Sequence, residues 1–170
     1  MTAQLNLKTH EDLIIRKAQI DDCHELWLWR NHLEVKRWCF KTDEIPYKQH
    51  EKWFEQALKD EKKTIFIIEN SKKQKLGQVR FEIEKEHSAS ININLNPQFF
   101  NQGIGSFAIK LATEVFLRLN PSLQEIVAGI MEGNISSQKS FEKAGYIFER
   151  NGIRHSRKIN ILNFKNQITA

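Results

Sequence analysis

Apolar residues recur along the chain with two different periods, and each period predicts a different secondary structure. Residues 76–84 and 88–95 alternate apolar with polar side chains, which is the pattern of a strand with one buried face. From residue 103 to residue 120, apolar residues recur every three or four positions and predict an amphipathic helix. Pro97 follows the second strand and Gly145 follows a shorter helical pattern, so both mark element ends.

The same signals, applied along the whole chain, predict seven strands and four helices. The strands are expected at residues 13–18, 64–69, 76–84, 88–95, 125–131, 146–150 and 157–164, and the helices at residues 20–31, 46–60, 103–120 and 136–144. This order calls for a mixed sheet with helices on both faces. No repeat, low-complexity stretch or linker divides the chain, so a single domain over residues 1–170 is expected, with its core at about 13–164.

A glycine-containing loop joins the strand 88–95 to the long helix. Free backbone N–H groups and the positive end of the helix dipole make a helix start an anion site, and glycines let a phosphate approach the backbone closely. Two glycines at a helix start are also common in simple tight turns. Under the anion-binding interpretation the amides belong to Gln102, Gly103, Ile104, Gly105 and Ser106.

A second motif begins with Asn134 after the strand 125–131 and runs to residue 146 as Asn-Ile-Ser-Ser-Gln-Lys-Ser-Phe-Glu-Lys-Ala-Gly-Tyr. Asn134 or Ser136 suits a helix cap, Phe141 a core-facing position and Gly145 a helix stop.

The two motifs, about thirty residues apart, resemble those of the GNAT superfamily of N-acetyltransferases. The loop is similar to Arg/Gln-x-x-Gly-x-Gly/Ala, with Gly103 and Gly105 matching both glycines, although Phe100 replaces the Arg/Gln and Asn101 stands where a further glycine is common. The second segment resembles Asn-x-x-Ser/Ala-x-x-x-Tyr/Phe-Glu-Lys-x-Gly-Phe/Tyr.

This resemblance implies an α/β (α+β) GNAT fold with a mixed, mostly antiparallel sheet of about seven strands and helices on both faces. It also implies acetyl-CoA as cofactor, bound by Ile93, Leu95, the loop 102–106, Asn134, Ser137 and Phe141. Many relatives have a tyrosine at the Phe141 position that protonates the departing thiolate. A thiol with a reference pKa near 8.5 is a reasonable leaving group without that help.

The place where the acetyl-accepting amine binds is indicated by polar residues that share one face of two adjacent strands. These include Arg80 and Glu82 on one strand and Asn92 and Asn94 on the next. Such a face is either exposed to solvent or part of a polar pocket, and we favour the pocket.

Three further segments, 27–31, 34–38 and 76–82, resemble bacterial N-acetyltransferases that act on a 4-amino sugar nucleotide in pseudaminic acid biosynthesis. The resemblance implies a small-molecule amine acceptor, a UDP-linked 4-amino-4,6-dideoxy sugar. One of Trp27 and Trp29 is expected in the core, because helix neighbours point about 100° apart. The expected substrate contacts are Trp29, Arg30, Asn31, Trp38, Arg80, Asn92 and Asn94.

Amine attack on a thioester needs a base, because an ammonium has no lone pair. Glu82 is the first candidate and Glu132 the second, with bulk water as the alternative. Two other functions stay open: N-terminal acetylation of a ribosomal protein or other peptide, and a GNAT-fold CoA-binding module without catalysis.

Composition sets the remaining expectations. A net charge of +5 suits an anionic small molecule, and we expect no nucleic-acid or membrane partner. Two cysteines are too few for a disulfide framework, so a cytoplasmic protein with reduced thiols is expected. The histidines are isolated and predict no metal site, and a homodimer is compatible with the sequence.

Overall fold

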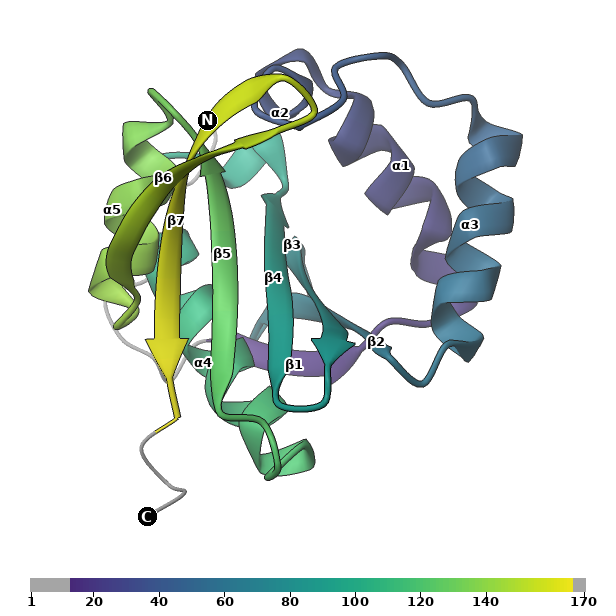
Figure 1. Ribbon diagram of the computed structural model, residues 1–170. Helices are drawn as coiled ribbons and strands as arrows, with labels where there is room; N and C mark the ends of the chain where they lie inside the picture. The colour runs from purple at the N-terminus through teal and green to yellow at the C-terminus, as the bar shows by residue number, and fades with distance from the viewer. Residues whose placement is uncertain (1–12, 167–170) are drawn as a thin grey trace.

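The computed structural model describes residues 13–166 of the chain (Figure 1). Its elements are β1 (Leu13–Lys17), α1 (Cys23–Asn31), α2 (Leu33–Lys36), α3 (Tyr47–Lys59), β2 (Lys63–Asn70), β3 (Lys75–Lys85), β4 (Ser88–Leu95), α4 (Ile104–Leu119), β5 (Glu125–Met131), α5 (Ile135–Lys143), β6 (Ile147–Arg154) and β7 (Arg157–Lys165). The seven strands and four longer helices confirm the sequence prediction, whereas the one-turn helix α2 was not predicted. Within residues 13–166, no helix is long and apolar enough to cross a membrane.

All seven strands form one sheet in the order β1-β2-β3-β4-β5-β7-β6. Every neighbouring pair is antiparallel except β4 and β5, which run parallel. The predicted mixed, mostly antiparallel sheet is therefore confirmed.

Helices cover both faces of the sheet, and each face has its own hydrophobic core (Figure 1). On one face α4 and α5 pack against the central strands, with Phe116 of α4 stacked on Phe81 of β3 at 4.1 Å between ring centroids. On the other face α1 and α3 bury Trp29 and Phe54 against Ile67 of β2.

The parallel strands β4 and β5 are hydrogen-bonded along only half of their length. Their pairing runs from Ser88 opposite Glu125 to Ile91 opposite Ala128. Beyond that point residues 92–95 of β4 pair only with β3, and residues 129–131 of β5 pair only with β7. The two strands thus present backbone N–H and C=O groups to each other across a gap, which we call the β4–β5 opening.

The predicted end of the sixth strand at residue 150 is wrong, because β6 continues to Arg154. Asn151-Gly152 has the sequence of a tight turn, yet the chain turns at His155 and Ser156, whose φ angles are 48° and 62°. Gly152 has a packing role instead, since a Cβ there would lie 2.9 Å from Cδ1 of Ile161 on β7.

Candidate functional site

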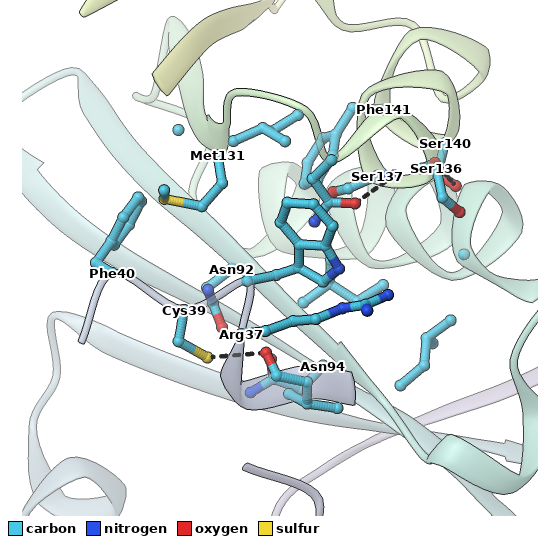
Figure 2. A pocket seen from close by; sticks show the side chains of 18 of the residues that line it. Arg37, Cys39, Phe40, Asn92, Asn94, Met131, Ser136, Ser137, Ser140 and Phe141 are labelled. Carbon is cyan, nitrogen blue, oxygen red and sulfur yellow. Dashed lines mark hydrogen bonds between the residues drawn. The ribbon is translucent and has the colours of Figure 1, made fainter. Parts of the chain in front are cut away.

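A cavity of about 530 Å³ lies at the β4–β5 opening (Figure 2). Its walls come from the end of β4, the end of β5, the start of α4, one side of α5 and the irregular segment between α2 and α3. Figure 2 shows Asn92 and Asn94 of β4 at the centre, Ser136, Ser137 and Ser140 of α5 on one side, and Phe40 and Met131 on another. The cavity therefore joins the two sequence motifs to the predicted acceptor strands.

The loop before α4 has the left-handed backbone that its glycine motif requires. Gly103 has φ 75° and Asn101 has φ 60°, a region that asparagine tolerates better than most residues, which explains how it can replace a glycine there. A Cβ at Gly103 would meet nothing within 4 Å, whereas one at Gly105 would lie 3.1 Å from Oγ of Ser140. Gly105 thus also allows α4 and α5 to pack closely, a role that sequence reasoning missed.

The side chains of the other loop residues point elsewhere. Ile104 is buried in the core, Gln102 donates to the carbonyl of Gln98 at 3.5 Å, and the Ser106 hydroxyl donates to the carbonyl of Gly103 at 3.4 Å. Only their backbone amides at the start of α4 are suited to an anion, as the sequence motif predicts.

The α5 motif lines the cavity and also stabilises its own helix. Asn134 accepts a hydrogen bond from the Ser137 N–H at 3.2 Å, which caps α5, and both residues line the cavity. Phe141 is only 3% exposed and lies edge-to-face with Tyr146 at 5.0 Å, so it is a core residue that reaches the cavity wall.

Residues of β4 divide between the two faces of the sheet because they alternate along the strand. Ile93 and Leu95 line the cavity and pack against the core under α4, whereas Asn92 and Asn94 lie on the opposite face, directly across from Arg80 and Gln78 of β3. The predicted polar face is thus the wall of a pocket.

Two arginines of the cavity wall have unused hydrogen-bonding capacity. Burial lowers the pKa of Arg80, whose guanidinium lies 5.1 Å from the centroid of the Trp53 ring and has no hydrogen bond or salt bridge within residues 13–166. Arg30 donates from Nη2 to the Lys41 carbonyl at 2.6 Å, while its buried Nη1 has no partner in the described part of the chain. Both side chains are therefore ready to bind an anion.

A small polar pocket of about 90 Å³ adjoins the cavity and contains Glu82. Arg80, Asn92 and Gly129 line both spaces, and Arg154 lines the small pocket only. The Glu82 carboxylate is 42% exposed and lies 3.4 Å from Lys63 Nζ. Glu132, in contrast, is exposed just after β5 and lines neither space, so the structure does not bring it to the site.

Two of the expected substrate contacts, Trp29 and Asn31, do not line the cavity. Trp29 is 6% exposed in the core between α1, α3 and β2, and it does not line the cavity. Asn31 bonds the backbone N–H and C=O of Ile45 at 2.9 Å each, which fixes the loop before α3. Trp38, by contrast, lines the cavity with the Arg37 guanidinium 5.2 Å from its ring centroid.

Several wall residues were not singled out from the sequence: Cys39, Phe40, Met131, Arg154 and His155. Burial raises the pKa of the Cys39 thiol, which donates to the carbonyl of Val35 at 3.5 Å. These residues come from irregular segments and strand ends, where periodicity gives no signal. Within residues 13–166, no group of three or more His, Cys, Asp or Glu residues is arranged to hold a metal ion.

Comparisons with known proteins agree with this fold. Residues 12–147 match the family model described as the acetyltransferase (GNAT) domain. Spermidine N-acetyltransferase from Vibrio cholerae, solved with CoA and spermine, superposes with a TM-score of 0.81 at 16% identity, covering 91% of this chain and 96% of that one. The aminoglycoside acetyltransferase AAC(6′)-Ib, solved with ribostamycin and coenzyme A, gives 0.81 at 16% identity over 92% and 94%. Among curated protein sequences, none matches this chain. Because the family model spans most of the chain, this protein belongs to the GNAT acetyltransferase domain family.

Proposed function

We propose that this protein transfers the acetyl group of acetyl-CoA to a primary amine at the β4–β5 opening. The observation that carries the proposal is the divergence of the two parallel strands after Ile91 and Ala128, next to the start of α4. The gap offers the free backbone groups of residues 92–95, and α4 offers its N-terminal amides to phosphate. Acetyl-CoA supplies an acetyl group activated as a thioester.

Glu82 is the proposed general base. It lines the small pocket beside the cavity, two residues along β3 from Arg80 and opposite Ser90 of β4, where a carboxylate can accept the proton of an acceptor ammonium directly or through a water. Phe141 has no hydroxyl, so this side chain does not supply a proton to the leaving thiolate.

The finer proposal concerns the acceptor, a UDP-linked 4-amino-4,6-dideoxy sugar. The combined walls of the two spaces carry five cationic side chains and two acidic ones; the cations are Arg30, Arg37, Lys41, Arg80 and Arg154, and the acids are Glu34 and Glu82. The structural neighbours, in contrast, are named for spermidine and for aminoglycosides, and one of them is bound to spermine; all of these are polyamines. A polycation would meet like charge here, whereas a diphosphate would satisfy the unpaired groups of Arg30 and Arg80.

Thiol release from acetyl-CoA tests the proposal. The protein is incubated with the UDP-linked 4-amino sugar, with a peptide bearing a free N-terminus, or with spermidine. Saturable release with the sugar nucleotide, and a raised KM in Arg80→Gln with unchanged CoA affinity, would support it. Release only with the peptide favours N-terminal acetylation, release only with spermidine contradicts the anionic acceptor, and CoA binding without release from any amine indicates a non-catalytic module.

We further propose that the protein is cytoplasmic and forms a homodimer. Cys23 and Cys39 are both free thiols, as expected in a reducing compartment. The edge strand β6 exposes 74% of Ile147 and 77% of Ile153, and two copies could pair along this edge. Analytical ultracentrifugation of the wild type and Ile153→Lys tests this, since a monomeric wild type would refute it.

A further inference from the structure

Residues 37–41, which we call the acceptor segment, form one wall of the cavity without regular secondary structure. Every residue of the acceptor segment lines the cavity, and Phe40 also lines the small pocket that contains Glu82. Its first three N–H groups bond back to carbonyls of residues 33, 35 and 36, but within residues 13–166 its carbonyls accept only from arginine side chains. The position of this wall therefore depends partly on side chains from elsewhere.

Arg157, the first residue of β7, supplies two of these bonds. Its Nη1 donates to the carbonyl of Cys39 at 2.6 Å and its Nη2 donates to the carbonyl of Arg37 at 3.3 Å. The two partners lie 118 and 120 residues away in sequence. A guanidinium presents its donors as a rigid planar fork, so one side chain fixes two carbonyls at once.

The rest of the β6–β7 turn contacts the same segment. The Arg154 guanidinium lies 4.7 Å from the centroid of the Phe40 ring, and the centroid of the His155 ring lies 6.4 Å from the same Phe40 centroid. His155 and Ser156 both have positive φ, a conformation that costs non-glycine residues free energy. This strained turn places Arg154, His155 and Arg157 against the acceptor segment.

The turn is also tied to the reacting end of the site. Two residues after Arg157, Ile159 pairs with Met131, the last residue of β5 and part of the cavity wall. Arg157 therefore connects the strand that borders the β4–β5 opening with the acceptor segment. The CoA side, made by α4 and α5, has no hydrogen bond to Arg157.

We propose that Arg157 is a positioning residue that holds the acceptor segment in place for the amine substrate. The identity of the substrate rests on the proposed function, whereas the clamp, by which we mean the two hydrogen bonds from Arg157 to the acceptor segment, does not. A lysine cannot reproduce the fork, because its single ammonium cannot align with both carbonyls as the planar group does. Loss of the fork should loosen the acceptor segment and leave CoA binding intact.

Chemical labelling of the Cys39 thiol tests the proposal directly, because it needs neither acetyl-CoA nor an amine. Its thiol is half-buried with a raised pKa, while the other cysteine, Cys23, is buried in the α1–α3 core and serves as an internal reference. We expect iodoacetamide to label Cys39 about tenfold faster in Arg157→Lys than in the wild type, the scale of one lost charged hydrogen bond. Arg150→Lys, at an exposed position on β6 paired with Glu149, is the matched control and should label at the wild-type rate.

CoA affinity, the melting temperature and the KM for the acceptor complete the labelling test. CoA affinity and the melting temperature report whether Arg157→Lys is folded. If it is not, Arg157→Gln provides a second variant, and because it also removes a positive charge that lowers the pKa of the Cys39 thiol, its labelling rate is corrected for the thiol pKa measured in that variant. Equal labelling of Cys39 in wild type and in a folded variant would overturn the clamp, whatever the acceptor proves to be. With an acceptor identified by thiol release, a higher KM at unchanged kcat supports the positioning role, and unchanged KM refutes it.

Discussion

Replacing Asn134 separates a structural role from a ligand-binding role at the same side chain. Its Oδ1 caps α5 by accepting from the Ser137 N–H, while its Nδ2 donates no hydrogen bond within residues 13–166 although the residue lines the cavity. The capping bond predicts that Asn134→Ala loses about 1 kcal/mol of stability. For a chain of this length, that corresponds to a fall of about 2–4 °C in Tm.

Asn134→Ser keeps the cap and removes the amide, so it is the matched control. If the Nδ2 donates to CoA, both variants lose one neutral hydrogen bond of about 0.5–1.5 kcal/mol, and the Kd for CoA rises about 2- to 13-fold in each. Calorimetric titration and thermal unfolding measure the two effects separately. A less stable Asn134→Ala with wild-type CoA affinity would show that the residue only caps the helix.

Three other substitutions test particular parts of the structure. Glu82→Gln should lower kcat/KM about 10²–10⁴-fold near pH 7 and less at high pH, where the amine is already neutral; a rate within a few-fold of wild type from pH 6 to 9 would refute the base. Burial alone would raise the pKa of Asp22, but hydrogen bonds from Arg16, the Gln19 N–H and Lys75 lower it to about 2. Asp22→Asn should therefore cost about 2 kcal/mol above pH 4, and the difference in urea unfolding should shrink as the pH falls below 4 and vanish only below pH 2; a pH-independent difference would contradict this. Gly152→Ala, whose Cβ would lie 2.9 Å from Cδ1 of Ile161, should lose about 1 kcal/mol in the same assay, because only the end of that side chain must shift, and unchanged stability would contradict the packing role.

The sheet and its long helices could be predicted because local patterns decide them. β4 and β5 have the bounds that the sequence predicts, since the alternation in one and the apolar run in the other are unambiguous. The end of β6 could not be predicted, because Asn151-Gly152 favours a turn locally and only the Ile161 side chain on β7 explains the glycine.

The CoA side of the site was more predictable than the acceptor side for the same reason. The loop before α4 and the cap of α5 are continuous in sequence, so their motifs are visible before folding. In the acceptor segment, Phe40 contacts Arg154 and the Cys39 carbonyl accepts from Arg157, and the members of each pair are more than 110 residues apart in sequence. Trp29, expected as a substrate contact, lies in the core away from the cavity, because helical spacing cannot tell which of two neighbouring tryptophans faces the core.

Titration of CoA into the acceptor-free protein tests the proposed site most directly. Asn101 lines the cavity in the left-handed loop before α4, and Asn101→Asp adds a negative charge with almost no change of shape. The same charge in Gln124→Glu lies beyond the other end of α4, a 16-residue helix that spans about 24 Å, and serves as the control. We predict one CoA per chain in the wild type, unchanged affinity in Gln124→Glu, and affinity at least about fivefold weaker in Asn101→Asp, because like charges 4 Å apart repel by about 1 kcal/mol even in water. Absence of CoA binding, or equal affinity in all three proteins, would contradict a phosphate site at the start of α4.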